Sequence, residues 1–153
     1  LIKEFKTGEK YLADAFADRM FPILLSQFRG VDMLAFVPMT QSAEKARGYN
    51  QAELLANVLS QRCGIPLERD LLVKTRETAE QKDLSAAERA KNLQGSIRVH
   101  ERAVCRGKNI VLIDDVLTTG ATASVAAKAI LRAGALRVYV LTVASVPERS
   151  QNI

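Results

Sequence analysis

The chain has 153 residues, of which 48% are hydrophobic and 25% charged, and this composition is typical of one globular domain. The formal net charge of +5 suits a polyanionic ligand and leaves nucleic acid open as a partner. No apolar run approaches the roughly 18 residues of a membrane span, and no secretory signal pattern is present. Cys63, Cys105 and His100 cannot supply four zinc ligands, so we expect reduced thiols in a cytoplasmic protein.

The chain begins with a predicted helix and strand. Apolar residues recur at helical spacing over residues 11–27, and Pro22 is expected to kink or split this helix. Its expected buried stripe is Leu12, Phe16, Met20, Ile23 and Leu24. Residues 31–37 predict the first strand, which Pro38 ends.

A polar stretch over residues 40–48 is then expected to be a flexible loop. Asn50 is a plausible cap for the helix that follows, which should stop near Gly64. The loop carries Lys45 and Arg47 into the amino terminus of that helix. Basic side chains and unpaired helix N–H groups together outline an anion site.

The middle of the chain is less regular. Residues 71–74 predict a short strand, and residues 76–82 lack an apolar period, which indicates an exposed, mobile loop. A capping box then begins a short helix over residues 85–92, and residues 95–99 predict another strand.

The strongest signal is the apolar run 110–113, which is followed by Asp114 and Asp115. The run does not alternate, as expected of a parallel strand covered on both faces. We expect this strand to stop at Asp114, because two adjacent carboxylates are costly to bury without partners. A helix over residues 123–133 and a strand over residues 138–144 complete a right-handed βαβ unit.

The turn between this strand and this helix contains Thr118, Thr119, Gly120 and Thr122. It is not a P-loop, and no GxGxxG pattern occurs. Carboxylates accept hydrogen bonds from vicinal hydroxyls, while a helix amino terminus and hydroxyl groups hold phosphate. This combination favours a sugar diol that also carries a phosphate, as in ribose 5-phosphate compounds.

Residues 111–122, VLIDDVLTTGAT, resemble the phosphoribosyl pyrophosphate (PRPP) motif of the type I phosphoribosyltransferases. The resemblance implies an α/β fold with a mainly parallel central sheet flanked by helices, a small hood and a flexible lid loop. It places Asp114 and Asp115 on the ribose hydroxyls, directly or through Mg²⁺. The implied 5-phosphate site is Thr118, Thr119, Gly120, Ala121 and Thr122.

Two further blocks make the resemblance narrower. Val37-Pro38 with Arg47-Gly48-Tyr49-Asn50-Gln51, and the spacing R-x-T-x-x-Q-x-x-L-x-x-x-x-R-x-x-N from Arg76 to Asn92, are similar to the competence protein F family. The resemblance assigns the pyrophosphate to Lys45 and Arg47, although Ala43 stands where that family usually has an arginine. Arg76 and Gln81 would belong to the lid.

The resemblance implies a phosphoribosyltransferase domain over residues 1–147 and a tail over residues 148–153. Members of the family commonly carry an amino-terminal zinc-binding segment that this sequence lacks. Either the segment was removed before Leu1 or this is a member without it, and the missing initiator methionine favours removal. A homodimer is left open.

The implied activity is transfer of a 5-phosphoribosyl group from PRPP to an unknown nitrogen acceptor with release of pyrophosphate, linked to competence and DNA uptake. The alternative is a non-catalytic competence factor that keeps a PRPP site and works through single-stranded DNA or a competence helicase. A regulator with this fold is a third interpretation, because fold alone does not choose among them.

Overall fold

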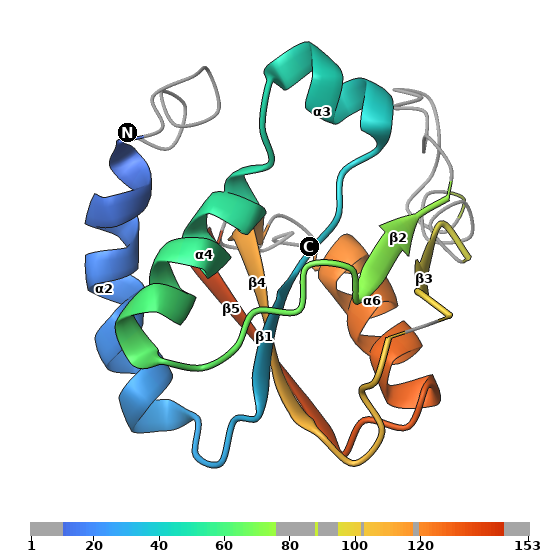
Figure 1. Cartoon of the computed structure of the whole chain (residues 1–153). Helices are drawn as coiled ribbons and strands as arrows, with labels where there is room; N and C mark the ends of the chain where they lie inside the picture. The colour runs from blue at the N-terminus through green and yellow to red at the C-terminus, as the bar shows by residue number, and fades with distance from the viewer. Residues whose placement is uncertain (1–10, 76–87, 89–94, 102, 118–119, 146–153) are drawn as a thin grey trace, which may run out of the picture.

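The computed structural model describes residues 11–75, 88, 95–101, 103–117 and 120–145. Their main sheet is parallel and has the strand order β1-β4-β5 (Figure 1). These strands are β1 (Met33–Phe36), β4 (Asn109–Leu117) and β5 (Arg137–Ser145). A separate antiparallel pair consists of β2 (Leu72–Lys74) and β3 (Ile97–Val99). The helices are α2 (Leu12–Gln27), α3 (Gln41–Arg47), α4 (Gln51–Cys63) and α6 (Ala121–Arg132).

Strand β4 is the centre of the core. Its residues Ile110, Val111, Leu112 and Ile113 are all fully buried, because each face of the sheet is covered. Val111 and Ile113 pack with α2 and α4, whereas Ile110 and Leu112 pack with α6 and the β2–β3 pair. The prediction of a parallel strand covered on both faces is confirmed.

The connections that leave β1 and β4 run in opposite directions. After β1 the chain passes through α4, and Leu67 then forms a parallel bridge to Leu34 on the side of β1 away from β4. After β4 the chain passes through α6 to β5 on the other side. Ligands of open α/β sheets bind at the carboxyl ends of strands where the order reverses in this way. The fold therefore directs attention to the ends of β1 and β4.

Helix α2 begins one residue later than predicted and ends where predicted, and it runs through Pro22 without being split. One expectation about its buried face is wrong. Its buried stripe contains Phe16, Met20 and Leu24, while Ile23 is 45% exposed. The buried face follows Leu24 at the end of the helix, and Ile23 lies about 100° away at the edge of that face.

The polar stretch expected to be a loop is instead helix α3, so that prediction is wrong. The Thr40 hydroxyl caps its start by accepting a hydrogen bond from the Ala43 N–H (3.2 Å). Gly48 ends it with a φ of 87°, a left-handed conformation that glycine adopts at little cost. No residue of α3 is buried, so the helix has no apolar stripe by which its sequence could indicate it.

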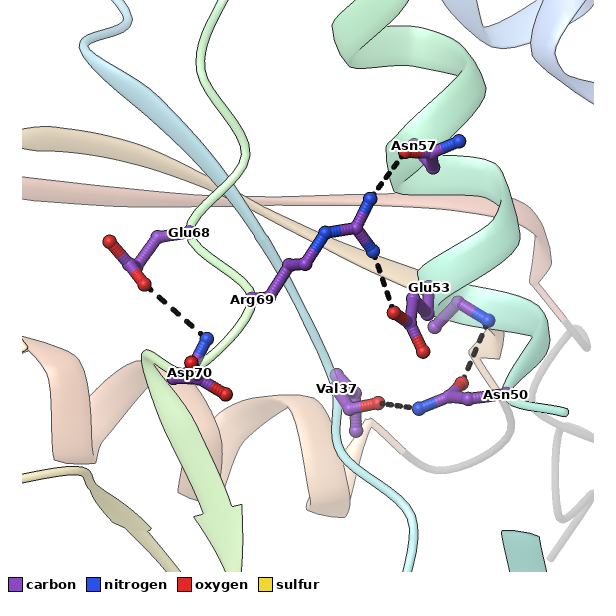
Figure 2. Close-up of polar contacts among 8 residues, drawn as sticks. Val37, Asn50, Glu53, Asn57, Glu68, Arg69 and Asp70 are labelled. Carbon is purple, nitrogen blue, oxygen red and sulfur yellow. Dashed lines mark hydrogen bonds and ion pairs between the residues drawn. The ribbon is translucent and has the colours of Figure 1, made fainter.

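Asn50 joins the end of β1 to the start of α4, as Figure 2 shows. Its side chain is buried, with 5% of the residue exposed. Asn50 Nδ2 donates to the Val37 carbonyl (3.1 Å), and Asn50 Oδ1 accepts from the Ala52 N–H (2.9 Å). The predicted cap is confirmed, and it also fixes where α4 begins relative to the sheet.

Two smaller expectations concern cysteines and membrane spans. Cys63 and Cys105 are free, and burial raises the pKa of the Cys105 thiol. No helix among the described residues is long and apolar enough to cross a membrane.

The Asn50 contacts predict a large effect of one substitution. In Asn50→Ala the cap is lost and the Val37 carbonyl is left buried without its donor, so the free energy of unfolding should fall by about 2 to 4 kcal/mol. Asn50→Asp keeps the cap acceptor but not the donor. Urea denaturation measures both variants against Gln61→Ala, an exposed change on the same helix that should cost under about 0.5 kcal/mol. Equal stability of Asn50→Ala and Gln61→Ala would contradict this role.

Candidate functional site at the carboxyl ends of β1 and β4

The two aspartates lie within β4 rather than after it, so the prediction that the strand stops at Asp114 is wrong. The pairing with β5 includes Asp114 and resumes at Val116. Asp114 Oδ1 accepts from the Asp115 N–H (2.8 Å), and Asp115 Oδ1 accepts from the Val116 N–H (2.7 Å). Both residues are half-buried. Backbone N–H donors and partial exposure supply what the carboxylates need, so the strand can extend through them.

Helix α6 begins two residues earlier than predicted, directly beyond these aspartates. Gly120 is its amino-terminal cap, with a φ of 72° that strongly favours glycine. Ala121 and Thr122 follow in the first turn and are half-buried. No acidic residue lies in this turn, so no carboxylate of the turn itself offsets the positive end of the helix dipole. Thr118 and Thr119 lie outside the described residues.

The predicted pyrophosphate residues lie in the last turn of α3. Lys45 and Arg47 are both exposed. Arg47 Nη1 donates to Oε1 of Gln51 (2.9 Å), the first residue of α4. Arg47 is therefore held at the amino terminus of α4. Gln51 ends the sequence block that begins at Arg47, but the sequence analysis predicted no role for it. The spacing of four residues between Arg47 and Gln51 is the one feature of the sequence that could have indicated this contact.

A short series of contacts brings these two groups of residues to one edge of the sheet. Val37 follows β1, and its N–H donates to the carbonyl of Ile113, the residue before Asp114 (2.9 Å). The Val37 carbonyl in turn accepts from Asn50, which precedes Gln51. The amino terminus of α4 and the aspartates of β4 are thus linked through Val37. Figure 1 shows α3 beyond this same edge.

Arg69 ties the loop before β2 to helix α4 (Figure 2). Its guanidinium donates to Glu53 Oε1 (2.7 Å) and to Asn57 Oδ1 (2.6 Å). These contacts are exposed and so contribute little to stability. They fix where the loop leading into the β2–β3 pair lies relative to α4, and no pattern in the sequence predicted them.

The β2–β3 pair is separate from the main sheet and carries one half-buried cation, Lys74. Lys74 pairs with buried Ile97 across the two strands and shares the alternation of Leu72, so it lies on the face that packs toward α6. Burial lowers the pKa of Lys74. A three-residue strand is too short for its sequence to reveal this placement.

Arg76 and Gln81, which were predicted to belong to a lid, lie outside the described residues, as does the helix expected over 85–92 apart from Glu88. Among the residues that are described, no group of three or more His, Cys, Asp or Glu side chains gathers to hold a metal ion. Two carboxylates, such as those of Asp114 and Asp115, are enough for Mg²⁺. This ion is commonly bound through one or two carboxylates and takes its other ligands from water and substrate phosphates.

Comparison with known sequences bears on what this site is for. Residues 46–153 match the family described as Phosphoribosyl transferase domain. "DNA utilization protein YhgH" of Escherichia coli K12 is 37% identical over 109 residues, which are 71% of this chain and 47% of that protein. "Competence protein F" of Haemophilus influenzae is 28% identical over 150 residues, covering 92% of this chain and 64% of that protein. The chain thus spans about half the length of the first of these relatives.

Solved structures show the same fold. Adenine phosphoribosyltransferase from Thermoanaerobacter pseudethanolicus has a TM-score of 0.58 and 15% identity, over 90% of this chain and 82% of that one. Glutamine PRPP amidotransferase from B. subtilis has a TM-score of 0.53 and 23% identity, over 88% of this chain and 26% of that one. The predicted fold class and the resemblance to the competence protein F family are confirmed. This chain belongs to the phosphoribosyl transferase domain family and has the type I phosphoribosyltransferase fold.

Proposed function

We propose that this chain binds PRPP with Mg²⁺ at the carboxyl ends of β1 and β4 and transfers its 5-phosphoribosyl group to a nitrogen acceptor. The observation that carries the proposal is the linkage through Val37. Its N–H donates to the carbonyl of Ile113, the residue before Asp114, and its carbonyl accepts from Asn50. Asn50 in turn precedes Gln51, which binds Arg47. On this proposal, carboxylates, two helix amino termini and a guanidinium contribute to one site at the carboxyl ends of these strands. Each of these groups suits a different part of a sugar that carries phosphate at both ends.

The roles follow the order of the groups along the edge. The amino terminus of α6, with Gly120, Ala121 and Thr122, would hold the 5-phosphate, and Thr118 and Thr119 complete that set. Asp114 and Asp115 would accept hydrogen bonds from the ribose hydroxyls. Lys45 and Arg47 would meet the diphosphate, where a guanidinium can bind two oxygens at once.

The chemistry needs no covalent nucleophile on the protein. The lone pair of the acceptor nitrogen forms the new bond to C1 of the ribose as the bond from C1 to the pyrophosphate oxygen breaks. The sugar gains cationic character while a polyanion leaves, so the protein assists mainly by electrostatic stabilisation. Mg²⁺, when bound, would supply positive charge at the leaving pyrophosphate. The lid residues Arg76 and Gln81 would exclude water from this step.

The names of the relatives suggest the setting of this activity. They refer to competence and DNA utilisation, which supports a link between this protein and DNA uptake or use. The acceptor is not specified by any described residue.

A basic cluster, defined as Arg106, Lys108, Arg132 and Arg137, favours a second candidate function. The Leu136 N–H donates to the Lys108 carbonyl (2.8 Å), Arg106 packs against Gly134, and Arg137 pairs with Asn109 at the first position of β4. These contacts place Arg106, Lys108 and Arg137 at the amino ends of β4 and β5, opposite the proposed PRPP site, and Arg132 lies in the last turn of α6, just before Gly134. A cluster of this kind suits the phosphates of single-stranded DNA, as in a competence factor that acts without catalysis or beside a helicase.

The proposed site predicts that the aspartates contribute to PRPP binding more than to stability. In Asp114→Asn and Asp115→Asn, calorimetric titration should give an affinity for PRPP in the presence of Mg²⁺ about 10- to 100-fold weaker than wild type, because each change removes a charge-assisted interaction. Binding by wild type should itself weaken without Mg²⁺. Asp14→Asn, at an exposed carboxylate on α2, is the matched control and should bind normally. A folded double aspartate variant with wild-type affinity would refute the assignment.

The basic cluster predicts a separate effect on DNA. Changing Arg132 and Arg137 to alanine should weaken binding of fluorescent single-stranded DNA and reduce the slope of log K against log salt by about 0.7 for each phosphate that the protein no longer neutralises. PRPP binding should not change. Arg19→Ala with Arg98→Ala removes the same charge from other exposed positions and serves as the control. Equal DNA affinity in the two double variants would exclude the cluster as the site.

A further inference from the structure

Gln51 is a buried residue whose amide is only half used. It is the first residue of α4 and is 1% exposed. Its Oε1 accepts from Arg47 Nη1 at 2.9 Å, while its Nε2 has no hydrogen-bond partner within the part of the chain that the structure describes. A guanidinium can only donate, so the amide oxygen must face Arg47. The unpaired group is therefore the Nε2 donor, and exchanging the two amide atoms would not satisfy it.

The neighbouring side chain does not supply the missing acceptor. Asn50 uses its own amide on the Val37 carbonyl and on the Ala52 N–H. A buried N–H without an acceptor destabilises a folded protein. An unpaired donor at this position thus indicates an acceptor beyond the described residues, and a bound ligand can be that acceptor.

The surroundings show what kind of acceptor fits. Lys45 and Arg47 bring two positive charges to the last turn of α3, and the amino terminus of the thirteen-residue helix α4 adds a positive dipole end. Gln51 Nε2 lies on the same amide as the oxygen that binds Arg47. The unpaired donor and the Arg47 guanidinium are therefore next to each other in one polar group at the start of α4.

We propose that Gln51 and Arg47 together bind the diphosphate of PRPP, each by donating hydrogen bonds to it. Gln51 Oε1 holds the guanidinium in place, and Gln51 Nε2 donates its free N–H to the diphosphate. This inference rests on the proposed function, because it takes PRPP as the ligand. It adds a residue that both positions Arg47 and selects for the diphosphate end of the substrate.

Separate titrations of pyrophosphate with Mg²⁺ and of ribose 5-phosphate test the proposal. In Gln51→Leu the affinity for pyrophosphate should fall about 10-fold or more, as for one charge-assisted hydrogen bond, while that for ribose 5-phosphate stays within about twofold. Gln51→Glu keeps an acceptor for Arg47 but removes the donor and adds a negative charge. It should retain the melting temperature of wild type and weaken pyrophosphate binding at least as strongly. Gln61→Leu, on the exposed end of α4, should change neither affinity.

The outcomes separate this inference from the proposed function. Wild-type protein that binds PRPP, with Gln51→Leu and Gln51→Glu binding pyrophosphate normally, would overturn the role of Gln51 alone. If Gln51→Leu lowered the affinity for pyrophosphate and for ribose 5-phosphate equally, Gln51 would have only a structural role, and this would also overturn the proposal. Wild-type protein that binds neither PRPP nor pyrophosphate would overturn both. If Gln51→Leu does not fold, Gln51→Glu decides, since its carboxylate keeps the Arg47 contact.

Discussion

The pairing of β1 with β4 is the constraint on which the rest of this structure depends. Phe36 lies beside Ile113, and the Val37 N–H continues that ladder to the Ile113 carbonyl. The connections that leave these two strands run to opposite sides of the sheet, so the strand order reverses between their carboxyl ends. Helices α4 and α6 begin at these ends. The candidate site is thus a consequence of strand order as much as of individual residues.

The sequence was sufficient for the elements that carry a local signal. The apolar run in β4, the Asn50 cap and the helical stripe of α2 were each predicted from a few neighbouring residues. Helix α3 could not be predicted in this way, because it is held by its two caps and buries nothing. The end of β4 was misplaced because the N–H groups of Asp115 and Val116 satisfy the two carboxylates locally, which burial arguments about isolated charges do not include.

The same distinction between local and long-range signals applies to the candidate site. Asp114, Asp115, Gly120 and Arg47 stand in continuous motifs, and their predicted positions are at or next to one edge of the sheet. Contacts between residues far apart in the chain, such as Arg69 with Glu53, are set by packing and leave no periodic trace. The significance of Gln51 appears only once its burial and its single partner are known.

The most direct test of the central claim is a crystal structure of the protein with PRPP and Mg²⁺. The account predicts the 5-phosphate at Gly120, Ala121 and Thr122, the ribose hydroxyls at the β4 aspartates, and the diphosphate at Arg47. Because a helix amino terminus and a guanidinium bind phosphate differently, the orientation of the ligand is also predicted. PRPP bound in the reverse orientation, or at another face of the sheet with this edge unoccupied, would contradict the account.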